Sequence, residues 1–146
     1  MAGDPGAEER VIQEQIRRLK APDRLTRVHA AAALSALGRR AQGAVHALVE
    51  ALTDPDVQVR KMAALALGDI GPGVGAAVPA LVEALRDENE GVRRRAAMAL
   101  GDLGEEARAS IPALLQALHG PSEGVRTMAA LALDRIDPTA LSGRAA

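Results

Sequence analysis

A unit of 33 residues recurs along this chain, and it constrains the fold more than any other feature. Two neighbouring copies, residues 54–86 and 87–119, align without an insertion. A less regular copy precedes them at 21–53, and a half-length copy follows at 120–137. Fixed periods of about 20–50 residues are typical of solenoids, in which similar supersecondary units stack in a row. We therefore expect one repeat domain over residues 8–137.

Each unit is predicted to contain two helices that pack against the neighbouring units. In the copy at 54–86, the first helix covers residues 56–70 and the second covers about 75–86, with a Gly-Pro-Gly stretch between them. The residues that we expect to face the core are Val59, Ala63, Ala66, Leu67 and Ile70 in the first helix and Val78, Leu81, Val82 and Leu85 in the second. A single helix pair cannot bury both faces alone, so the pattern predicts an all-α stack.

The N-terminal end departs from the repeat. Residues 1–7 contain two Gly and a Pro and are predicted to be disordered. Residues 8–20 are predicted to form an amphipathic capping helix, which corresponds to the second helix of a repeat. Its apolar stripe consists of Val11, Ile12, Ile16 and Leu19.

The C-terminal end departs as well, because the half repeat at 120–137 lacks a second helix and is followed by a tail at 138–146. Unless residues 139–141 fold over this end, Val125, Leu133 and Ile136 are expected to be partly exposed. An apolar solenoid end of that kind favours self-association.

The composition excludes several classes of protein. Basic residues number 18 and acidic residues 19, so the chain is not a polyelectrolyte built to coat nucleic acid or an anionic membrane. It has no Cys, hence no disulfide and no thiolate metal site. No apolar run reaches the roughly 20 residues that span a bilayer, and the polar N-terminus is not a signal peptide. We expect a cytoplasmic protein with no membrane contact.

The repeat carries the motif D-x-[DN]-x-x-V-R-x-x-A-A-x-A-L-G-[DE]-[IL]-G, followed by [VI]-P-A-L-[VL]-x-A-L, at residues 54–85 and 87–118. Over residues 21–137 the chain resembles the HEAT repeat family, specifically the bacterial HEAT-like repeats also found in phycobilisome lyase subunits. The resemblance implies a right-handed α-solenoid (an α-α superhelix) of about four helix pairs. The end units deviate most, with Ser35 in place of Gly68, His46 in place of Pro79, and Gly120 in place of the leading Asp.

Arg and Asp recur at fixed places in the repeat. The Arg column is Arg27, Arg60, Arg93 and Arg126, and the Asp column is Asp54 and Asp87. A repeated Asp/Arg pattern has the look of a phosphate-binding or catalytic site. The resemblance instead implies a structural ladder that links neighbouring units through hydrogen bonds to loops and side chains, and we favour this interpretation.

No catalytic, cofactor-binding or metal-binding constellation is found. His29, His46 and His119 lie on different predicted helices without a metal-ligand motif. No Ser lies in a G-x-S-x-G elbow, and the Gly-rich stretch at 71–75 lacks the GK[ST] ending of a phosphate loop. In the basic run at 93–95, Arg93 belongs to the Arg column, and Arg94 and Arg95 are interpreted as solvated charge, since nucleic-acid contacts of this kind usually include aromatic residues.

Two surfaces remain as candidates for binding. The resemblance implies that the second helices line the concave side, where the candidate partner surface consists of Arg17, His46, Glu50, Pro79, Glu83, Arg86, Pro112, Gln116 and His119. Large apolar residues also recur on the first helices, at Met62, Leu65, Met98, Met128 and Leu131. We interpret these as packing between neighbouring first helices; a Met-rich contact surface is the alternative.

We therefore expect a non-enzymatic interaction scaffold or adaptor that presents a curved surface to an unidentified protein partner and needs no cofactor. Two alternatives stay open. One is a bilin lyase-type subunit, which rests on the repeat subtype. The other, a nucleic-acid-binding HEAT-like protein, is disfavoured by the net charge of -1 and the absence of aromatic residues. The regular spacing also allows a designed protein, although the irregular ends favour a natural bacterial one.

Overall fold

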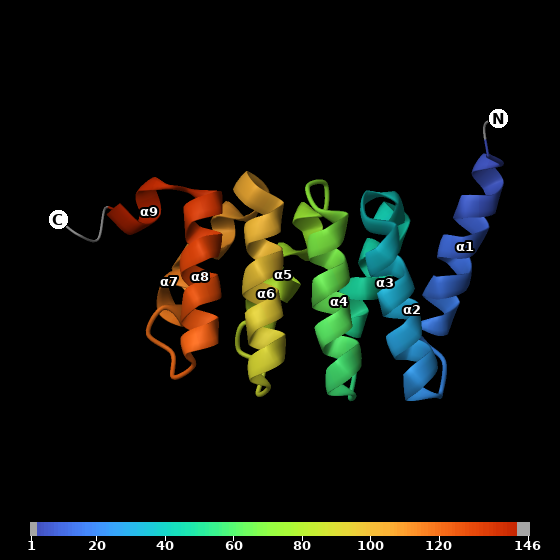
Figure 1. Cartoon of the computed structure of the whole chain (residues 1–146), viewed down its shortest axis with the longest axis horizontal. Helices are drawn as coiled ribbons and strands as arrows, with labels where there is room; N and C mark the ends of the chain where they lie inside the picture. Colours follow the sequence, from blue (N-terminus) through green and yellow to red (C-terminus); the bar gives the residue numbers. More distant parts are fainter. Residues whose placement is uncertain (1–2, 143–146) are drawn as a thin grey trace.

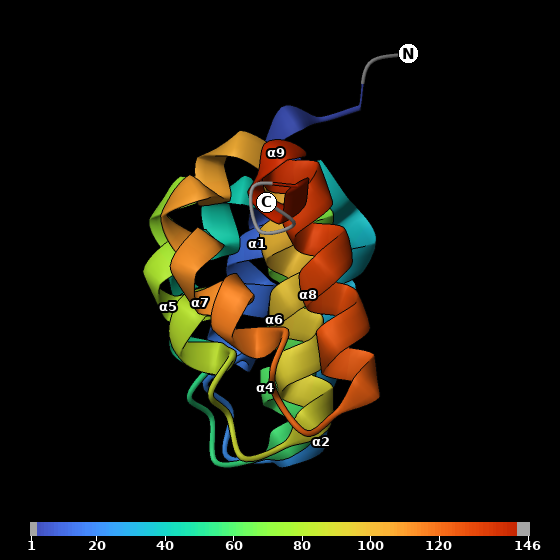
Figure 2. The same cartoon turned by 90° about the vertical axis from the view of Figure 1, so that its left-hand side faces the viewer.

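The computed structural model describes residues 3–142, which form two layers of helices arranged in a row (Figure 1). The first layer contains the A helices: α2 (Arg24–Leu37), α4 (Val57–Ile70), α6 (Glu90–Leu103) and α8 (Glu123–Ile136). The second contains the shorter B helices: α3 (Val45–Ala51), α5 (Val78–Ala84) and α7 (Ile111–Ala117). Figure 2 looks along the row and shows α5 and α7 on one side and the A helices on the other. The all-α solenoid predicted from the repeat is confirmed.

Local signals set where each A helix begins and ends. Asp23, Asp56, Asn89 and Ser122 each accept hydrogen bonds from backbone N–H groups of the following first turn. Three of the four A helices end at a Gly with positive φ, a conformation that side chains disfavour. A 3₁₀ segment then leads into each B helix: η1 (Gly38–Ala44), η2 (Gly75–Ala77) and η3 (Gly104–Ser110). The α-helical part of α5 is therefore shorter than the predicted 75–86.

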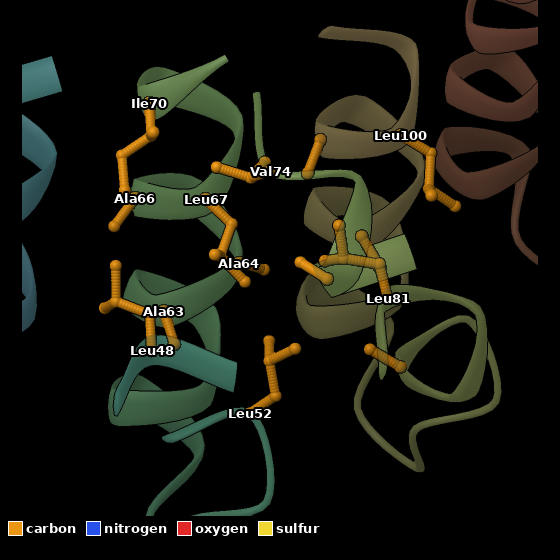
Figure 3. Packing of buried hydrophobic residues seen from close by; sticks show 14 of the residues in the cluster. Leu48, Leu52, Ala63, Ala64, Ala66, Leu67, Ile70, Val74, Leu81 and Leu100 are labelled. Carbon is orange, nitrogen blue, oxygen red and sulfur yellow. The ribbon is translucent and has the colours of Figure 1, made fainter. Parts of the chain in front are cut away.

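The buried apolar residues form one continuous cluster between the helices. Figure 3 shows part of this cluster around α4. The predicted core face of α4 is confirmed, since its five apolar residues are all inaccessible to solvent. The equivalent Ala and Leu columns of the other A helices are buried in the same way: Ala30, Ala96 and Ala129, and Leu34, Leu100 and Leu133. In α5, Val78 and Leu81 are buried, as is Leu85 directly after it, but Val82 is only partly buried.

Glycine allows neighbouring A helices to come close together. A Cβ atom on Gly101 of α6 would lie 3.0 Å from the Cα of Ala132 in α8, and one on Gly68 of α4 would lie 3.1 Å from the Cα of Ala99 in α6. Both contacts are with backbone, which cannot swing aside. At the same position of α8 stands Asp134, which is exposed, since within residues 3–142 no further A helix packs against it. A side chain is therefore tolerated at this position of α8.

The N-terminal prediction needs correction. Helix α1 (Pro5–Arg18) begins within the stretch predicted to be disordered. Asp4 caps it by accepting a hydrogen bond from the Gly6 N–H at 2.9 Å, and its bond to Arg10 holds the pKa of Asp4 below its usual value. Val11 is exposed, so the predicted apolar stripe is wrong there; it lies about 100° around the helix from the buried Ile12. Residues 1–2 lie outside the described residues.

The C-terminal end is covered. Helix α9 (Thr139–Ser142) contacts α8, and Ala140 and Leu141 pack against the core. Val125, Leu133 and Ile136 are buried, so the partly exposed apolar end considered above is not found. The last four residues of the predicted tail, 143–146, lie outside the described residues. Within residues 3–142, no helix is both long and apolar enough to cross a membrane.

The close approach at Gly101 gives a first prediction. Replacing Gly101 with Val should lower the free energy of unfolding by about 2 kcal/mol, because the added methyl groups push against the backbone of α8. The matched control is Asp134→Val, at the same repeat position but exposed, which should change it by less than about 0.5 kcal/mol. Urea unfolding measures both, and equal effects would contradict the packing argument.

Candidate functional site

The Arg and Asp columns meet across the boundary between repeats. Arg27 donates two hydrogen bonds to the Asp54 carboxylate, from Nε at 2.9 Å and from Nη2 at 3.3 Å. Arg60 grips Asp87 in the same way, at 2.9 and 3.2 Å. These four side chains are only 10–16% exposed. Each Arg therefore binds the Asp that lies 27 residues later in the chain, and each such pair is called a rung below.

Each rung is held from further sides by the backbone. The Nη1 group of Arg60 donates to the carbonyl oxygens of Asp54 and Pro55, at 2.9 and 3.2 Å. The carboxylate of Asp87 also accepts a hydrogen bond from the Asn89 N–H at 2.9 Å. Two-pronged Arg–carboxylate pairs of this kind are strong and directional. The two rungs consequently fix the loop before α4 to α2 and the loop before α6 to α4.

The rungs stop before the end of the row. Arg93 donates from Nη1 to the carbonyl oxygens of Asp87 and Glu88, but Gly120 stands where the earlier rungs have an Asp. Arg126 donates to the carbonyl oxygen of Gly120. Within residues 3–142, neither Arg93 nor Arg126 is paired with a carboxylate.

Grooves open on the B-helix side. The A helices contact one another directly, whereas the B helices contact mainly the A helices and the 3₁₀ segments. A first groove of about 730 Å³ lies between α3 and α5. Its apolar lining is Val49, Leu52, Ala80 and Ala84, and its charged lining is Asp54, Arg60, Glu83, Asp87 and Glu88. A second groove of about 180 Å³ lies between α5 and α7 and is lined by Val82, Leu85, Arg86, Ala113, Gln116 and Ala117.

The nine residues of the candidate partner surface are all exposed. Only Glu83, Arg86 and Gln116 line the two grooves. The other six do not line a groove: Arg17, His46, Glu50, Pro79, Pro112 and His119. Of these, Arg17 pairs with Glu14, and the Nε2 atom of His46 lies 3.1 Å from Oε1 of Glu50.

Two residues that line the grooves do not follow from the sequence pattern. Helical spacing predicts Val82 in the core; it does pack against the core, but it is only partly buried and also lines the second groove. Glu88, in the loop after α5, lines the first groove and was not among the candidates. The signal that could have revealed Val82 is the short B helix, because helices of seven residues with loops on both sides leave their flanks partly uncovered.

The outer face of the A helices is more exposed than predicted. Met62 and Met128 pack against the core, as expected for contacts between neighbouring A helices. Met98 and Leu131 are 40% and 49% exposed, so the packing interpretation is wrong for these two. They line a shallow groove of about 190 Å³ between α6 and α8.

A polar row also joins the A helices. Ser35 donates a hydrogen bond to Asp69, and Arg135 donates one to Asp102 at 3.0 Å. Partial burial between the helices raises the pKa of Asp102 above its usual value, although its side chain is still 36% exposed; Arg135 of α8 opposes this, and the negative charge of Asp69 on α4 adds to it. Arg95 of α6 lies with Asp102 along a narrow crevice between α4 and α6. Among the described residues, no cluster of three or more His, Asp or Glu side chains could hold a metal ion.

Comparison with known proteins places the chain in a family. The family model for HEAT repeats matches residues 12–77 and 78–142, which is most of the chain. The protein therefore belongs to the HEAT repeat family. No curated protein matches it.

Several solved structures share the fold. An engineered protein from the Northeast Structural Genomics Consortium is 26% identical with a TM-score of 0.75, over 93% of this chain and 69% of that one. A designed armadillo repeat protein in complex with the peptide (KR)4 is 20% identical with a TM-score of 0.76, over 89% and 69%. The CpcE–CpcF complex of phycocyanin lyase from Nostoc sp. PCC7120 is 23% identical with a TM-score of 0.63, over 92% and 68%. The likeness to the last two concerns the fold alone.

The Arg60–Asp87 rung predicts that substitutions at two neighbouring residues of the loop after α5 differ strongly in their effect on stability. Asp87→Ala should lower the free energy of unfolding by about 3 kcal/mol, because it leaves the enclosed Arg60 guanidinium without its carboxylate. Glu88→Ala, at the next residue, removes a carboxylate that is 91% exposed and should change stability by less than about 0.5 kcal/mol. Thermal and urea unfolding of both variants test this; similar losses would show that the rung contributes no more than surface charge.

The raised pKa of Asp102 predicts a pH dependence. A carboxyl whose folded-state pKa is raised contributes stability that is complete below its unfolded pKa of about 3.9 and is lost as the pH rises through the folded value. Asp102→Asn removes this loss. The difference in unfolding free energy between variant and wild type should thus shift in favour of the variant from pH 4 upward. Urea unfolding at several pH values measures it, and a difference that does not change with pH would contradict the assignment.

Proposed function

We propose that the protein is a non-enzymatic scaffold that binds an extended segment of a protein partner along its B-helix grooves. The observation that carries the proposal is the groove of about 730 Å³ between α3 and α5. Its lining combines apolar side chains with a charged rim, which is the usual make-up of a protein-binding surface. The repeat fold is typical of proteins that bind rather than catalyse.

The charges of the first groove favour a basic partner. Its lining has four carboxylates and one guanidinium. Asp54 and Asp87 are neutralised by the rungs. The side chains of Glu83 and Glu88 are 73% and 91% exposed. Within residues 3–142 they pair with Arg only at long distances, with Arg86 Nη1 at 3.8 Å and Arg60 Nη2 at 3.9 Å, so the groove keeps an excess of carboxylates. Complementary charge steers binding and fixes the register of the partner. The expected partner segment therefore carries apolar side chains flanked by Lys or Arg at this groove.

The preference for a basic segment rests on Glu83 and Glu88 of this chain. The designed armadillo protein solved with a (KR)4 peptide has a similar fold, but at 20% identity it provides no residue-level support. Outside the grooves, His46 and Glu50 are assigned to the edge of the interface, where contacts contribute less to affinity.

Selection from a displayed library of random peptides tests the proposal. The wild-type protein should enrich sequences with apolar residues next to Lys or Arg. For a selected peptide, the double variant Glu83→Lys/Glu88→Lys should raise the dissociation constant at least about tenfold, or 1.4 kcal/mol. Fluorescence anisotropy at two salt concentrations provides the measurement.

The matched control is Glu105→Lys, an exposed charge reversal in η3 that lines neither groove. It should leave the dissociation constant unchanged. The proposal fails if no sequence is enriched, if acidic sequences are enriched, or if the double variant and the control bind equally well.

A further inference from the structure

Arg93 is prepared to bind a carboxylate in the same manner as the Arg residues of the two complete rungs. Its Nη1 group is fixed by the carbonyl oxygens of Asp87 and Glu88 at 2.8 and 3.1 Å. In Arg60 the corresponding distances are 2.9 and 3.2 Å. The guanidinium is therefore held in place by the backbone alone, and its Nε–Nη2 edge points to where the next repeat would supply a carboxylate.

Gly120 occupies that place in the sequence and supplies none. A Cβ atom on Gly120 would have the carbonyl oxygen of Ala117, at 3.5 Å, as its only neighbour within 4 Å, so the space beside it is open. Among the described residues, no carboxylate pairs with Arg93. The Nε–Nη2 edge of Arg93, which corresponds to the edge that binds an Asp in the two complete rungs, is thus available to a group from outside the chain.

A second donor belongs to the same place. In the complete rungs, the Asp carboxylate also accepts the N–H of the residue two positions later: Asp56 for Asp54 and Asn89 for Asp87, both at 2.9 Å. The equivalent residue beside Gly120 is Ser122. No hydrogen bond from its N–H is found within residues 3–142. The position equivalent to Ser122 in a further repeat is not among residues 3–142, so Arg126 has no such second donor within them.

We propose that Arg93 and the Ser122 N–H together bind a carboxylate from an acidic side chain of the partner segment. This deepens the proposed function and rests on it. The site lies at the loops beside the second groove, whose only charged lining residue is Arg86. The first groove has an excess of carboxylates, whereas Arg86, whose Nη1 lies 3.8 Å from Glu83 Oε1, and Arg93 give the second groove and its loops a basic character. A partner segment with a basic residue followed by an acidic one fits this order.

A carboxylate is favoured over a phosphate because the two complete rungs hold Asp carboxylates with the same three donor groups. A planar carboxylate matches the two parallel N–H bonds of the guanidinium edge. Phosphate is retained as an outcome of the test.

NMR of the full chain, with acetate as the probe, tests the site directly. In a titration at constant ionic strength, the Nε–Hε signal of Arg93 and the amide signal of Ser122 should shift together and saturate. The corresponding signals of Arg27 and Arg60 should not move, because their edges are filled. Sodium chloride at the same ionic strength is the reference, and Arg93→Lys, which keeps the charge and removes the edge, should abolish the response.

The variant Gly120→Asp supplies the missing carboxylate within the chain. It should move the Arg93 Nε–Hε signal toward those of Arg27 and Arg60 without acetate, end the response to acetate, and raise Tm by about 2–4 °C. Gly120→Ser is the matched control; it adds a side chain without a carboxylate and should keep the acetate response. For a selected peptide that contains an acidic residue, Gly120→Asp should raise the dissociation constant at least about tenfold.

Three results would overturn the inference: no saturable shift at Arg93, an equal shift with equal affinity at Arg126, or tighter binding of inorganic phosphate than of acetate. Its failure is distinguishable from failure of the scaffold proposal. If peptides are enriched but bind Gly120→Asp as well as wild type, the scaffold stands and the Arg93 site falls. If Arg93 responds to acetate and no peptide is enriched, the carboxylate site stands and its assignment to a protein partner falls.

Discussion

The stack depends on the close packing of its A helices through small residues. Buried Ala residues and the glycines Gly68 and Gly101 bring the backbones of successive A helices almost into contact. Apolar area in a protein without aromatic side chains has to come from many such contacts. The spacing of the A helices then fixes the spacing of everything attached to them, including the loops with the Asp residues.

This spacing also creates the grooves of the proposed binding surface. The B helices are short and contact mainly the A layer, so they leave grooves between one another. The apolar residues on the flanks of the B helices, such as Val49 and Ala80, are only partly buried. A partner segment that covered Val49 and Ala80 would complete the burial that the fold leaves unfinished.

The same Arg geometry serves the stability of the fold in the two rungs and the proposed binding of a partner carboxylate at Arg93. Arg27–Asp54 and Arg60–Asp87 use their charges internally, which removes them as ligand sites. Where the Asp column ends at Gly120, the same Arg geometry remains without its internal partner. One substitution between repeats therefore separates a structural contact from a proposed binding contact.

The sequence by itself determined the period, the paired helices, the core face of α4 and the places of Gly and Pro at helix ends, because these follow from local spacing and backbone preference. Tertiary structure decided the rest. It exposed Met98 and Leu131, left Val82 in a groove and buried Ile136 next to α9. It also paired Arg27 with Asp54 and Arg60 with Asp87, while leaving Arg93 without a carboxylate among the described residues. Helical periodicity states which residues share a face. How closely another helix covers that face depends on distances between repeats, which no single repeat encodes.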